Sequence, residues 1–170
     1  AMNEEIGARV LRKEDPRFLT GRGAFVADLA VPDALHCAIV RSPHAHARIV
    51  RIDTSRAEAH PVVAAVLTGA DLERWCNPMV TAPAGWGPYS LAVGKTRFVG
   101  EPVAAVAASS RYIAEDACEL IDVEYEPLPV LVDAREAVKN ETVMHDDAGS
   151  NVVWSGVFDW GDWEGAKAEA

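Results

Sequence analysis

Residues 98–137 constrain the fold more than any other part of the chain. Residues 103–108 form an unbroken run of small apolar side chains, which is typical of a strand buried on both faces. Residues 121–126 alternate between apolar and acidic side chains, which predicts a strand with one face in water. Pro127 and Pro129 end this strand, because proline has no N–H to donate to a neighbouring strand.

The segment between these two strands predicts an amphipathic helix. Ser109 and Ser110 offer hydroxyl groups for its N-cap. Apolar side chains then recur at helical spacing, whereas charged side chains fall on the opposite face. The apolar positions are Ile113, Ala114, Ala117 and Ile121, and the charged ones are Arg111, Glu115, Asp116 and Glu119. A strand, a helix and a second strand in this order predict a fold of the α/β class.

Shorter elements are expected on both sides of this stretch. Residues 35–41 and 47–53 have strand patterns, and the short turn between them suits an antiparallel pair. A capping box at residues 55–58 opens a short helix, and Thr68 with Asp71 opens another. The remaining expected elements are a strand over residues 62–67, a helical turn over 133–136 and a helix from residue 163 to the end of the chain.

Three regions lack a regular pattern. Residues 1–34 predict an extended arm with short strands, in which Phe25 begins a strand that leaves a glycine turn around Arg22. Residues 77–94 form a long loop of proline, glycine and aromatic residues, and such loops are usually functional or covered by a partner. Residues 152–163 contain three tryptophans, more apolar aromatic surface than a chain end usually leaves in water. We expect something outside the chain to cover them. The helix-forming run of residues 163–170 stops without a C-cap or a terminating glycine, so we expect the chain to be the N-terminal piece of a longer protein.

Composition excludes some classes of function. The formal charge of −10 and pI near 4.9 argue against nucleic-acid binding, which requires clustered Lys and Arg. The sequence contains no apolar run of the roughly 18 residues that a membrane helix needs. Cys37, Cys76 and Cys118 are far apart, and we expect them to be buried free thiols in a reducing compartment. Cytoplasmic location is the default expectation.

No motif predicts a complete active site. His36, His44 and His46 are candidates for a metal site, but the histidines of the proline turn are more simply interpreted as solvated. Asp146 and Asp147 have the pattern of a solvated loop surface. Glu101 differs, because it lies between a glycine and a proline at the mouth of a buried strand, where binding groups often lie.

Longer sequence matches reveal a family resemblance. The chain closely resembles the start of the molybdenum-binding large subunits of the xanthine dehydrogenase, aldehyde oxidase and carbon monoxide dehydrogenase family, and is most similar to the carbon monoxide dehydrogenase-like large chains. The segments that carry the resemblance are residues 12–29, 35–36, 41–49, 67–72, 99–104, 114–117, 123–129 and 161–162.

This resemblance implies a fold and a domain organisation. The expected fold is the α/β hammerhead, a mixed sheet with flanking helices and a long hairpin. Residues 1–34 would form the N-terminal arm, residues 35–138 the hammerhead domain, and residues 139–170 a linker with the truncated start of the molybdopterin-binding region.

The resemblance also implies a function for the parent protein. Enzymes of this family hydroxylate substrates at a molybdenum–molybdopterin centre with oxygen from water, and they pass electrons to iron–sulfur and flavin partners. The family's cofactor loops and catalytic glutamate lie beyond Ala170, so we expect no catalytic, cofactor-binding or metal-binding residue here. The chain would serve as scaffold and interface, with Arg22, Trp86, Glu101, Trp154, Trp160 and Trp163 as candidate contacts. The alternative is a stand-alone, non-catalytic interaction module.

Overall fold

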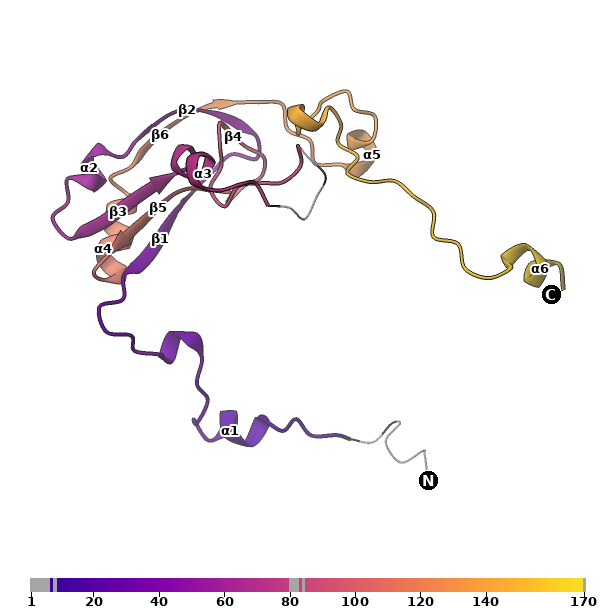
Figure 1. The fold of residues 1–170 in the computed structure, drawn as a ribbon, viewed down its shortest axis with the longest axis horizontal. Coiled ribbons are helices and arrows are strands. Elements are labelled where there is room, and N and C mark those ends of the chain that lie inside the picture. Colours follow the sequence, from indigo (N-terminus) through magenta and orange to yellow (C-terminus); the bar gives the residue numbers. More distant parts are fainter. Residues whose placement is uncertain (1–6, 8, 80–82, 84, 170) are drawn as a thin grey trace. The chain divides into compact units, whose positions relative to one another are not determined.

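A computed structural model describes residues 7, 9–79, 83 and 85–169 of the chain (Figure 1). The chain divides into two compact units, Ala1–Ala34 and Leu35–Ala170. The further division at residue 138, expected from the sequence, stays a prediction. Within the described residues, no helix is long and apolar enough to cross a lipid bilayer.

The larger unit contains two antiparallel sheets of three strands each (Figure 1). The first has the strand order β1 (His36–Arg41), β5 (Pro102–Ala108) and β3 (Val63–Thr68). The second has the order β4 (Lys95–Thr96), β2 (Ala47–Asp53) and β6 (Asp122–Pro127). Every expected strand of this unit is therefore present, and the two-residue strand β4 is an addition.

The larger unit also contains short helices. They are α2 (Ser55–Glu58), α3 (Gly69–Trp75), α4 (Arg111–Cys118), α5 (Ala134–Ala137), the 3-10 turn η2 (Asp146–Ala148) and α6 (Trp163–Glu169). The Thr68 amide and hydroxyl donate to the Asp71 carboxylate, 2.8 and 2.9 Å away, as the capping pattern predicted. Helix α2 begins differently, because Asp53 and not Ser55 accepts the capping hydrogen bonds.

The core lies around β5, the middle strand of its sheet. Val103, Ala104, Val106 and Ala108 are completely buried, and α4 packs on this region through Ala114 and Ala117. Ser110 caps α4 by accepting a hydrogen bond from the Ile113 amide at 3.3 Å. The strand, helix and strand predicted within residues 98–137 are thus confirmed, including the side of the helix that faces inward.

The expected pairing of β1 with β2 is wrong. Strand β1 pairs with β5, whereas β2 pairs with β4 and β6. The turn between β1 and β2 leads from one sheet to the other. Ser42 in this turn holds the end of β1 beside the start of β5, because it accepts a hydrogen bond from the Gly100 amide at 2.8 Å and donates one to the Glu101 carbonyl oxygen at 2.9 Å. The pairings between the described strands are antiparallel, so two antiparallel sheets replace the expected mixed sheet.

The smaller unit also differs from expectation. No strand is present among residues 7 and 9–34, which instead contain helix α1 (Asp15–Leu19) and the 3-10 turn η1 (Val26–Asp28). Pro16 near the start of α1 has a backbone angle already suited to a helix. The Phe25 amide donates to the Asp28 carboxylate at 2.9 Å, which closes η1 where a strand was expected. The backbone angle of proline therefore favours α1, and a local side-chain hydrogen bond closes η1.

Candidate functional site

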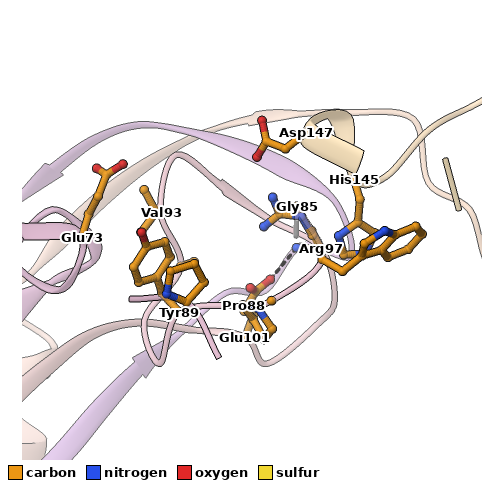
Figure 2. A pocket seen from close by; sticks show the side chains of 13 residues that line it. Glu73, Gly85, Pro88, Tyr89, Val93, Arg97, Glu101, His145 and Asp147 are labelled. Atoms are coloured by element: carbon orange, nitrogen blue, oxygen red, sulfur yellow. Dashed lines mark hydrogen bonds between the residues drawn. The ribbon is translucent and has the colours of Figure 1, made fainter. Parts of the chain in front are cut away.

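A cavity of about 360 Å³ lies where the long loop, β4 and the start of β5 approach η2 (Figure 2). We call it the Glu101 cavity. Its lining combines aromatic, carboxylate and basic side chains from segments distant in the sequence. The main side chains are those of Glu73, Trp86, Tyr89, Arg97, Glu101, His145 and Asp147.

Glu101 is the most deeply buried charged residue of this cavity. Its residue surface is only 4% exposed, although a carboxylate normally remains in water. The carboxylate accepts a hydrogen bond from the Arg97 amide (Figure 2). Gly100 precedes it with φ at +86°, a backbone angle that glycine adopts without strain, and Pro102 starts β5 immediately after it. The tight turn fixes this side chain at the cavity wall.

Basic groups on and beside β4 shape the electrostatics. Lys95 forms an ion pair with Asp146, and this hydrogen bond lowers the pKa of the Asp146 carboxyl. Burial lowers the pKa of His145, and the positive charges of Arg97 and Lys95 lower it further, against an opposing effect of Asp146. His145 is therefore a neutral imidazole at pH 7, and it adds an aromatic face to the cavity wall. Its ring centroid lies 4.6 Å from that of Trp86.

Two glycines allow the long loop to approach the rest of the unit closely. A Cβ atom on Gly85 would lie 2.9 Å from the Ala148 nitrogen, so only glycine fits against η2 without movement of the backbone. A Cβ atom on Gly69 would lie 2.0 Å from the Ala92 carbonyl oxygen, so the start of α3 lies directly on the end of the loop. These contacts hold the described parts of the loop over the cavity.

The histidines considered as metal ligands lie apart. His36 is on β1, and His44 lies with its ring 5.0 Å from that of Tyr125. His46 was expected to be solvated, which is wrong, because it is only 4% exposed and its Nδ1 lies 2.7 Å from the Pro129 carbonyl oxygen. Among the described residues, no group of three or more His, Cys, Asp or Glu side chains has an arrangement that could hold a metal ion.

The cysteines are free, but their expected burial is wrong for two of them. Cys37 and Cys76 are exposed, and Cys118 is half-buried. Cys37 lies on an edge strand, and Cys76 follows the last turn of α3, where no later element covers it. Burial raises the pKa of the Cys118 thiol, with smaller contributions from Cys37 and Glu115, so Cys118 remains protonated and unreactive at neutral pH.

The six candidate contact residues fall into three places. Trp86 and Glu101 both line the Glu101 cavity. Arg22 is in the smaller unit, where its side chain donates to the Thr20 hydroxyl at 3.0 Å. Trp154, Trp160 and Trp163 lie near the C-terminal end and are 63%, 84% and 68% exposed. Their role as contacts stays a prediction.

Sequence reasoning missed several residues of the cavity. Arg97 and Tyr89 carry no periodic signal, and His145 drew no attention in a polar stretch without regular structure. Asp147 was interpreted as solvated surface, and it is indeed exposed while its side chain borders the cavity. Only the composition of the long loop pointed to this region, because it predicted a functional loop without indicating which distant residues lie against it.

Comparison with known proteins identifies the family. Residues 20–129 match the family described as aldehyde oxidase and xanthine dehydrogenase, a/b hammerhead domain. The chain belongs to this family. The predicted hammerhead fold is thereby confirmed, and known structures agree with it. Quinoline 2-oxidoreductase from Pseudomonas putida 86 superposes with a TM-score of 0.76 at 48% identity, over 85% of this chain and 19% of that chain.

Curated relatives are similar over nearly the whole chain. The nicotine 6-hydroxylase large subunit of Paenarthrobacter nicotinovorans is 42% identical over 170 residues, which cover 97% of this chain and 21% of that protein. The carbon monoxide dehydrogenase large chain of Afipia carboxidovorans is 42% identical over 174 residues, which cover 96% of this chain and 22% of that protein. The chain therefore spans about a fifth of the length of the curated relatives it matches.

A molybdenum–molybdopterin group does not fit the Glu101 cavity. Such a cofactor carries a phosphate, whereas Glu73, Glu101 and Asp147 present three carboxylates to the cavity and Arg97 a single guanidinium. Like charges would repel the phosphate, and the described residues supply no matching set of metal ligands. We therefore derive no chemical step through this group from the residues of this chain.

Proposed function

We propose that this chain is the hammerhead portion of the large subunit of a molybdenum-dependent hydroxylase. The similarity to large subunits and large chains over nearly all of its length carries this proposal. The parent enzyme would be an oxidoreductase that inserts oxygen from water and passes electrons to iron–sulfur and flavin partners. The residues that bind the cofactor would then lie outside residues 1–170.

Within that enzyme, we assign the chain the role of scaffold and contact surface. Its core is built from strands, one amphipathic helix and small apolar side chains. The surfaces left open are the Glu101 cavity and the aromatic side chains near the C-terminal end. Cytoplasmic location is part of the proposal, and the free thiols of Cys37, Cys76 and Cys118 fit a reducing compartment.

The test is to isolate the natural protein with antibodies raised against residues 35–138. We expect them to recognise one polypeptide several times heavier than the 18.3 kDa of this chain, with molybdenum, iron and flavin in the same purified complex. Elemental analysis and flavin absorbance measure the contents. A natural polypeptide of about 18.3 kDa without molybdenum would instead support the stand-alone interaction module.

A further inference from the structure

The Glu101 cavity contains a buried carboxyl group that has no ion-pair partner among the described residues. Glu101 is 4% exposed, and the one hydrogen bond of its carboxylate within the described residues comes from the Arg97 backbone amide. No basic side chain of the described residues forms an ion pair with it, whereas Lys95 pairs with Asp146 nearby. A buried carboxylate loses its hydration, and proteins normally compensate this loss with a charged partner.

Other groups around the cavity add to the negative charge. The carboxylates of Glu73 and Asp147 line the same space, and Arg97 is the one basic side chain among its lining residues (Figure 2). The Arg97 Nε atom is buried without a hydrogen-bond partner in the described structure, so Arg97 is not held against Glu101. Three carboxylate residues and one arginine therefore line the cavity, and this excess of acidic groups favours a cation.

The cavity wall also has the chemistry that holds a cation. Trp86, Tyr89 and the neutral ring of His145 provide aromatic surface beside the carboxylates. Aromatic faces attract guanidinium and ammonium groups, and the attraction is larger where water is excluded. A volume of about 360 Å³ exceeds what one arginine or lysine side chain occupies and is too small for a folded element.

We propose that the Glu101 cavity receives one cationic side chain, an arginine or a lysine, from the part of the large subunit outside residues 1–170. This proposal rests on the proposed function for the source of the side chain, since the curated relatives are about five times longer than this chain. The incoming cation pairs with Glu101, stacks against the aromatic wall and fixes the long loop and η2 to the following domain.

The first test is an experimental structure of the complete large subunit. We expect a guanidinium or ammonium nitrogen from outside residues 1–170 within about 4 Å of a Glu101 carboxylate oxygen, the usual limit of an ion pair. A cavity filled by water, by an apolar side chain or by a carboxylate overturns the proposal.

A second test uses the 170-residue chain and a defined probe. N-acetylarginine amide is titrated while the Trp86 indole N–H signal is followed by NMR, with N-acetylcitrulline amide as the uncharged match. We expect a saturable shift with the arginine probe alone. Glu101→Gln keeps a hydrogen-bond acceptor for the Arg97 amide and removes the charge, so it weakens binding by about tenfold or more.

Matched variants protect this test from a folding artefact. Glu115→Gln removes an exposed carboxylate on α4 and leaves binding unchanged. Glu73→Gln, at an exposed position of α3, should weaken binding of the arginine probe less than Glu101→Gln does. If Glu101→Gln fails to fold, weaker binding by Glu73→Gln still shows that the carboxylates of the cavity bind the probe. Equal shifts with both probes, or affinities of Glu101→Gln and Glu73→Gln equal to that of the unaltered chain, overturn the proposal.

The two proposals can fail separately. If the natural protein is a short chain without molybdenum, the proposed function fails, but the arginine probe still shows whether the cavity binds a cation. If the natural protein is a long molybdenum-containing subunit and the cavity holds no cation, the proposed function stands and the cation site is wrong.

Discussion

The sheet around β5 and the stretch from Val152 to Trp163 are both rich in apolar side chains, yet their surroundings are opposite. Val103, Ala104, Val106 and Ala108 of β5 are fully buried. Val157 and Trp160 are 93% and 84% exposed, although Val157 has the same side chain as Val103 and Val106 and Trp160 has a larger one. The core side chains find partners within the chain because strand and helix periods place them on shared faces. The C-terminal stretch has no such period, and its large apolar side chains remain exposed in the described structure.

The largest expected effect tests this contrast with one substitution made in both regions. Val106→Asp places an unpaired carboxylate in the completely buried core, which should lower the free energy of unfolding by about 4 kcal/mol or more. Val157→Asp changes an exposed side chain and should alter it by less than about 0.5 kcal/mol. Urea denaturation followed by circular dichroism measures both. Similar losses for the two variants would show that the C-terminal stretch is also packed.

The same comparison applies to two glycines. Gly69→Ala places a Cβ atom 2.0 Å from a backbone oxygen, that of Ala92, and should cost about 1–3 kcal/mol of unfolding free energy. Gly156→Ala meets the end of the exposed Trp154 side chain at 2.2 Å, which can rotate away, so the cost should be near zero. Denaturant titration of both variants gives the difference, and a tolerated Gly69→Ala would contradict the close contact of α3 with the loop.

Helix α4 allows a finer test within the core region. Ser110→Ala removes the hydroxyl that accepts the Ile113 amide and should cost about 1 kcal/mol. Ser109→Ala, one residue earlier, removes an exposed hydroxyl and is the matched control, with no expected change. Thermal unfolding compares the pair. Equal melting temperatures would mean that packing alone holds the start of α4.

The smallest effect concerns pH. His145 has a lowered pKa, so the unfolded chain binds its proton more tightly than the folded chain does. Stability should therefore be full above the ordinary histidine pKa of about 6.5 and fall as pH drops toward the lowered value. His145→Gln should flatten the dependence of unfolding free energy on pH in this window, and His36→Gln, on the exposed part of β1, should leave it unchanged. If the unfolding free energy of His145→Gln depended more steeply on pH than that of the unaltered chain, the lowered pKa of His145 would be contradicted.

The elements that the sequence predicted correctly are those that depend on local patterns. Ser110, Ala114 and Ala117 obey local rules of capping and helical period, so the helix and its buried face followed from the sequence. The partner of β1 depends on the hydrogen bonds of Ser42 with residues 100 and 101, which lie far along the chain. Asp28 closes a turn where a strand pattern was expected, because one side-chain hydrogen bond outweighs a weak propensity.

The candidate site was predictable only in part. Glu101 stood out because a carboxylate between glycine and proline opens a buried strand, and Trp86 because of the loop composition. Arg97, His145 and Asp147 reach the same cavity through tertiary contacts that no local pattern encodes.

In the enzyme that we propose, the aromatic side chains of the C-terminal stretch are covered by the rest of the assembly. Oxidative footprinting with mass spectrometry can measure the labelling of Trp154, Trp160 and Trp163 in the natural complex and in the 170-residue chain. We predict strong labelling of all three in the 170-residue chain, where they are 63%, 84% and 68% exposed, and several-fold weaker labelling in the complex. Equal labelling in the two samples would contradict this prediction.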